Sequence, residues 1–61
     1  MVTNEEIIQM LADGLTFKEI AEVKKVNVRT VETRIFRLRE KTLTLTVTHL
    51  VANYLRKGLI K

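Results

Sequence analysis

A helix-start signal that occurs twice near the N-terminus constrains this chain most strongly. In this signal a threonine and a glutamate three positions later cap each other's backbone N–H groups in the first turn of a helix. It occurs at Thr3 with Glu6 and at Thr16 with Glu19. Between the two copies, Gly14 suits the left-handed conformation in which many helices end. The pattern predicts helices over residues 4–13 and 17–24, joined by a link so short that the chain must turn sharply.

A third helix is indicated by apolar side chains that recur at helical spacing after Asn27, a residue type favoured at helix N-termini. These side chains belong to Val28, Val31, Ile35 and Leu38. We expect a helix over residues 28–41 that buries these four side chains and leaves its opposite face free for contact.

The next segment, from Thr42 to Thr48, alternates between threonine and apolar residues in a manner typical of a strand. No second alternating run exists in the chain to pair with it, so we interpret the segment as an extended connector. In this connector Leu43 and Leu45 are expected to contact the core. Thr46 would then cap a fourth helix over residues 47–57.

The sequence therefore predicts one all-α domain that spans residues 1–61. It has no cysteine, so neither a disulfide nor a thiolate metal site can stabilise it. No apolar run approaches the roughly 18 residues of a membrane span, and the N-terminus lacks the features of a signal peptide. We expect a cytoplasmic protein without a membrane partner.

Catalysis is the least supported function. The chain has one histidine, His49, no cysteine and no glycine-rich phosphate loop. Its carboxylates fit helix capping better than they fit a general acid and base pair. We therefore expect no enzyme activity, no cofactor and no metal site.

Positive charge is concentrated in the middle of the chain. Residues 24–41 contain seven basic and two acidic residues, whereas residues 1–23 contain one basic and five acidic residues. Such a local excess favours a polyanionic partner, and nucleic acid more than membrane, although a solvated helix face is the alternative.

Two short helices with a tight turn, followed by a longer basic helix, have the layout of a helix-turn-helix module, which binds double-stranded DNA. Residues on the exposed face of the third helix are the candidates for reading bases: Arg29, Thr33, Phe36 and Arg37. Residues around this face are the candidates for phosphate contacts: Thr16, Lys18, Lys24, Lys25, Thr30, Arg34 and Lys41. For Phe36, peripheral packing is an equal alternative.

The chain resembles the C-terminal DNA-binding domain of the LuxR/GerE family of bacterial transcription regulators. The matching positions are Ala12, Gly14, Thr16, Lys18-Glu19-Ile20-Ala21, Thr30-Val31, Lys41, Thr48, Leu50-Val51 and Gly58-Leu59-Ile60. The resemblance implies that the third helix reads DNA and that the fourth forms a homodimer contact. On the wide apolar face of the fourth helix, this contact would use Val47, Val51, Tyr54 and Leu55.

The chain also departs from the LuxR pattern. Lys24 stands where the family has leucine, so Val23 or Val26 would take over the missing apolar contact. Thr42-Leu43 stands where the family has Leu-Gly, and Tyr54 replaces a favoured alanine near the expected dimer contact.

Residues 16–41 are also similar to region 4 of extracytoplasmic sigma factors. Both resemblances imply DNA binding through the third helix, but the sigma resemblance implies RNA polymerase as the partner rather than a second copy. The fourth helix fits the LuxR pattern better, because sigma region 4 usually ends soon after its recognition helix. A protein-interaction domain that docks through the fourth helix is a third interpretation.

Overall fold

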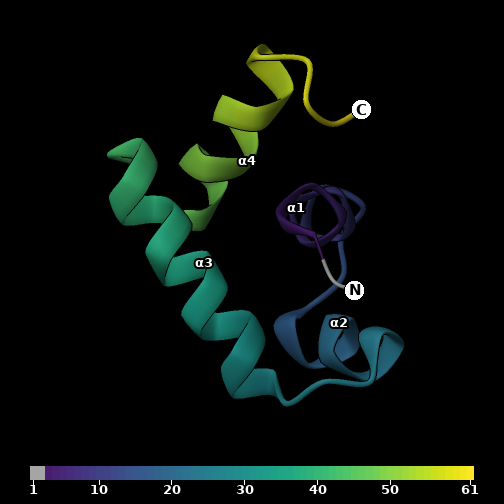
Figure 1. The fold of residues 1–61 in the computed structure, drawn as a ribbon. Coiled ribbons are helices and arrows are strands. Elements are labelled where there is room, and N and C mark those ends of the chain that lie inside the picture. The colour runs from purple at the N-terminus through teal and green to yellow at the C-terminus, as the bar shows by residue number, and fades with distance from the viewer. Residues whose placement is uncertain (1–2) are drawn as a thin grey trace.

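The computed structural model describes residues 3–61, which form four helices and, within that range, no strand. The helices are α1 (Asn4–Ala12), α2 (Phe17–Lys24), α3 (Val28–Thr42) and α4 (Val47–Arg56) (Figure 1). Each predicted boundary lies within one residue of the observed one, so the all-α prediction is confirmed. The threonine-rich segment after α3 is a turn and not a strand, as expected for a run without a pairing partner.

All four helices begin at the predicted caps. Both capping boxes are complete, and in the second the Glu19 backbone N–H donates to Thr16 Oγ1 at 3.1 Å. The Asn27 side chain accepts a hydrogen bond from the Arg29 backbone N–H at 2.8 Å, and the Thr46 hydroxyl accepts one from His49 at 3.0 Å. Local side-chain to backbone bonds therefore determine where each helix starts.

The helix ends follow two different patterns. After α1 and α4 the chain enters the left-handed region at Gly14 and Gly58, as expected for glycine. After α2 and α3 it does so at Lys25 and Leu43, with φ of 56° and 57°. These two left-handed residues were not predicted, because neither side chain favours this conformation.

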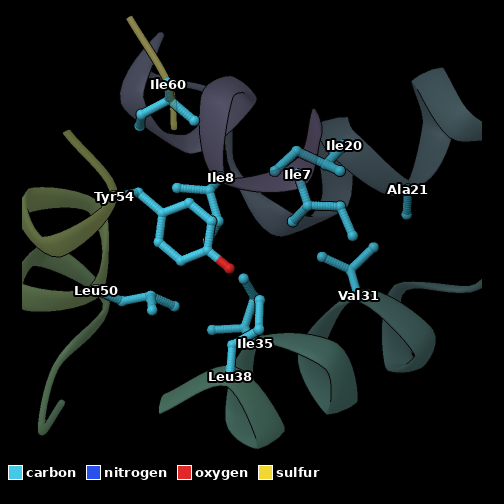
Figure 2. Packing of buried hydrophobic residues seen from close by; sticks show 10 residues of the cluster. All are labelled: Ile7, Ile8, Ile20, Ala21, Val31, Ile35, Leu38, Leu50, Tyr54 and Ile60. Atoms are coloured by element: carbon cyan, nitrogen blue, oxygen red, sulfur yellow. The ribbon is translucent and has the colours of Figure 1, made fainter. Parts of the chain in front are cut away.

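The helices surround one core (Figure 2). In Figure 1, α1 is seen along its axis, with α2 and α4 near it and α3 running past both; α1 and α3 each pack against α2 and α4. The buried hydrophobic side chains come from all four helices and from the C-terminal segment: Ile7, Ile8, Ile20, Ala21, Val31, Ile35, Leu38, Leu50, Tyr54 and Ile60.

The C-terminal segment completes the core instead of leaving it. Ile60 is buried, and the backbone N–H of Lys61 donates to Gln9 Oε1 of α1 at 2.8 Å. This returning segment and α4 together cover the side of α1 that faces away from α2.

Three predicted core residues are exposed. Val28, in the first turn of α3, is 39% exposed, whereas Val26 in the link before this helix packs against the core. Leu43 and Leu45 are 86% and 81% exposed, and the intervening Thr44 is buried. The left-handed turn at Leu43 explains this reversal, since it changes which face of the following chain points inward. The core predictions for Val28, Leu43 and Leu45 are therefore wrong.

Candidate nucleic-acid interface

The exposed face of α3 brings most of the predicted DNA-contacting residues together. Arg29, Thr33 and Arg37 follow one another at four-residue spacing, which places them in one row along the helix. They line a shallow groove together with Thr30 and Arg34. Arg34 and Arg37 continue into a neighbouring groove lined also by Lys41, Asn4 and Leu38. The basic surface thus runs along most of α3.

The charges of this surface are not neutralised within the fold. Among residues 3–61, the single ion pair joins Lys24 to Glu6. The guanidinium groups of Arg29 and Arg37 therefore have no carboxylate partner within that range. A row of unpaired cations on one helix face is the arrangement that attracts a polyanion.

Lys24 differs from the other predicted phosphate contacts, because its ammonium group is held by Glu6. This contact joins α2 to α1. The hydrogen bond from Lys24, together with those from Thr3, lowers the pKa of Glu6 to about 2. Lys24 thus contributes to helix packing in this structure. Of the two valines predicted to replace the apolar contact missing at Lys24, Val26 packs against the core and Val23 is exposed.

The remaining predicted phosphate contacts border the basic surface or lie on α2. Thr30 and Lys41 are exposed on α3, and Arg34 is half-buried and donates to Asn4 Oδ1 at 3.4 Å. Thr16 and Lys18 are exposed at the start of α2, and Lys25 is exposed at its end.

Phe36 is 58% exposed, which is unusual for a phenylalanine and does not support the packing alternative. It lines one groove beside Arg29 and Thr33. It also lines a second groove with Leu43 and Leu45. Phe36 therefore connects the basic row of α3 with an apolar surface at the end of that helix.

Arg39 was not singled out from the sequence, although it organises the segment after α3. Its guanidinium donates to the backbone carbonyl of Leu45, and its buried Nε has no protein partner among the described residues. The one sequence feature that points to this role is the position of Arg39 in the last turn of a helix, where basic residues are common.

The predicted dimer residues of α4 are unequally accessible. Tyr54 is only 8% exposed, and Figure 2 shows its ring reaching into the core toward Ile8 and Ile35. Its side chain is therefore not available on the free surface. Val47 and Val51 are half-buried and Leu55 is exposed, and these three line a groove with side chains of α1.

The structure also bears on two other kinds of site. Within residues 3–61, no group of three or more His, Asp or Glu side chains could hold a metal ion. In the same range, every helix is too short or too polar to cross a bilayer.

Comparison with known protein families identifies the first three helices. The family model for sigma-70, region 4, matches residues 3–42, which contain α1, α2 and α3. The chain belongs to the sigma-70 region 4 family. Sigma-70 region 4 is a helix-turn-helix DNA-binding module of transcription and not an enzyme family. Searches of curated proteins and of solved structures gave no significant match. The segment with α4 lies outside the part of the chain that matches sigma-70 region 4.

Proposed function

We propose that this chain binds double-stranded DNA sequence-specifically in transcription regulation, with α3 in the major groove. The observation that carries the proposal is the row of Arg29, Thr33 and Arg37 along the exposed face of α3, the second helix of the helix-turn-helix. The guanidinium groups of Arg29 and Arg37 have no carboxylate partner among the described residues. The family of residues 3–42 supports it, since this family binds DNA.

Base reading would follow from the side-chain chemistry of this row. The major groove, about 12 Å wide, admits an α-helix. The guanidinium groups of Arg29 and Arg37 would each donate two hydrogen bonds to O6 and N7 of a guanine. The Thr33 methyl group and the Phe36 ring would contact the methyl group of thymine.

Phosphate contacts would come from residues beside this row and would carry no sequence information. On α3 these are Thr30, Arg34 and Lys41, and on α2 they are Thr16, Lys18 and Lys25. Lys24 would contribute only after leaving Glu6, so we expect it to add less than the others.

The partner protein has two candidates. Membership in the sigma-70 region 4 family favours RNA polymerase. The LuxR/GerE resemblance favours a homodimer through α4, which would use the accessible side chains of Val47, Val51 and Leu55.

Selection of binding sites from a random duplex library tests the DNA proposal. An inverted repeat would support a dimeric regulator of the LuxR type, and a single asymmetric motif would support a sigma-like module. The absence of any enriched sequence would refute sequence-specific binding.

Three variants then separate base reading from phosphate contact. Arg37→Ala is expected to weaken binding to the selected site by about 1–3 kcal/mol and to relax base choice at one position. Lys41→Ala should weaken binding to all sequences alike and reduce the salt slope by about one unit. Arg56→Ala removes the same charge from the far end of α4 and should change neither. If Arg37→Ala loses the same binding free energy on selected and on scrambled duplexes, Arg37 does not read a base.

A further inference from the structure

An apolar surface at the C-terminal end of α3 is left unused by the proposed function. Phe36, Leu43 and Leu45 are 58%, 86% and 81% exposed, and they line one groove together with Arg39 and Glu40. Single exposed leucines are ordinary on protein surfaces, but three large apolar side chains around one groove mark an interaction site.

This surface is held in shape by the chain around it. Leu43 adopts the left-handed conformation with φ of 57° and ψ of 38°, and the Thr44 backbone N–H donates to the Arg39 carbonyl at 2.9 Å. Arg39 in turn donates to the carbonyl of Leu45. A bulky residue persists in a strained conformation only where its surroundings impose it, so the two leucines are presented by an ordered turn. Binding here would therefore cost little ordering of the chain.

We propose that a second copy of this chain docks on the surface formed by Phe36, Leu43 and Leu45 through a two-fold contact. In a two-fold contact the same patch occurs on both sides, so that residue i faces j and j faces i. The groove carries an acid and a base side by side, Glu40 and Arg39. Across the two-fold, the guanidinium N–H groups of Arg39 that are not held by the Leu45 carbonyl would face Glu40 of the other copy, while the apolar side chains meet at the centre.

The same charges argue against other occupants of the groove. A DNA backbone or a purely acidic segment could pair with Arg39 but would leave Glu40 facing like charge, whereas a second copy brings charges of both signs.

The contact has a consequence that rests on the proposed function. Phe36 belongs both to this surface and to the face of α3 that would read DNA. A second copy seated on Phe36 would cover part of the DNA-reading face, so that self-association and DNA binding compete. By linkage, DNA would then weaken the dimer by the same factor by which the dimer weakens DNA binding.

Sedimentation equilibrium of the full chain without DNA tests the contact. A stable interface usually takes about 20–30 residues from each partner, so this smaller patch predicts a weak dimer, with a dissociation constant of about 10–100 μM. Leu43→Asp and Leu45→Asp should each raise this constant at least about tenfold. Both sites are exposed and aspartate tolerates the left-handed conformation, so circular dichroism should show an unchanged helix content.

Three further variants distinguish this surface from alternatives. Leu59→Asp places the same charge on an exposed leucine outside both this surface and the α4 groove, and it should leave the dimer intact. Leu55→Asp tests the alternative contact through the α4 groove, and a dimer formed through Leu43 should survive it. Glu40→Lys removes one of the two complementary charges without touching the apolar side chains, and it should weaken the dimer severalfold. A chain that stays monomeric up to about 1 mM, or a dimer lost in Leu55→Asp but kept in Leu43→Asp, overturns the proposal.

A titration with the selected duplex tests the competition separately. The expected result is that excess duplex converts the dimer into complexes of duplex with single chains. A dimer that remains intact on DNA and still depends on Leu43 would overturn the competition. A chain that dimerises through Leu43 but binds no duplex would contradict the proposed function and leave the contact supported.

Discussion

Replacing Leu43 by glycine should stabilise the domain, although it removes a large apolar side chain. Leu43 has φ of 57°, and the left-handed conformation costs a residue with a Cβ atom about 1–2 kcal/mol. The side chain is 86% exposed, so its loss gives up little buried surface. Glycine carries an opposing cost of about 0.5–1 kcal/mol, because it is more flexible in the unfolded chain.

The balance predicts a gain of about 0.5–1 kcal/mol in the free energy of unfolding. For a domain of this size, 1 kcal/mol corresponds to about 4–8 °C in Tm, so Leu43→Gly should raise Tm by about 2–8 °C. Thermal unfolding followed by circular dichroism, at a concentration where the chain is monomeric, measures this shift.

Leu45→Gly is the matched control. Leu45 is exposed to a similar extent but does not have a positive φ, so glycine relieves no strain there. Its Tm should stay the same or fall, because only the entropic cost of glycine remains. A Tm of Leu43→Gly at or below the wild-type value would show that the left-handed turn is not strained, and the reasoning would fail.

Three further outcomes concern stability and ionisation. Leu50→Ala truncates a side chain with no exposed surface and should cost about 2–5 kcal/mol in urea unfolding, whereas the same change at the exposed Leu55 should cost far less. The contacts of Glu6 with Lys24 and Thr3 lower the pKa of its carboxyl to about 2. These contacts therefore stabilise the folded state at pH values above the pKa of an unperturbed glutamate, and this stabilisation is lost as pH falls toward 2. Wild-type Tm should therefore drop more steeply with acid than that of Glu6→Gln, and parallel curves would contradict this. Burial raises the pKa of Tyr54, the sole tyrosine. Its tyrosinate absorbance should therefore appear at a higher pH than that of a free tyrosine, and the free energy of unfolding should fall as pH rises through the raised pKa. A titration midpoint at the free tyrosine value would refute the buried position.

Features that depend on a few neighbouring residues were predictable. Both capping boxes, the caps at Asn27 and Thr46, and the extent of each helix follow from hydrogen bonds and periodicities within about one or two turns of the chain. The residues on the free face of α3 were predictable for the same reason, since their four-residue spacing places Arg29, Thr33 and Arg37 in one row.

Features that depend on the neighbouring element were not predictable. The left-handed turn at Leu43 has no local signature, because leucine is disfavoured there and only the surrounding contacts impose it. The pairing of Lys24 with Glu6 joins residues eighteen positions apart, and nothing in either local pattern requires it. Val28 is exposed although it continues the spacing of the buried Val31 and Ile35, because the neighbouring helices do not cover the first turn of α3 as they cover the later ones.

The sequence by itself thus determined four helices, their starting points, and a basic face on the third of them, because these features are encoded by short-range hydrogen bonding and side-chain period. The helical spacing also predicted the burial of Val31, Ile35 and Leu38, but tertiary structure decided which other apolar side chains are covered. It buried Tyr54 and Ile60 and exposed Leu43 and Leu45, because burial is settled by whichever element packs against a given face and not by the residues on that face.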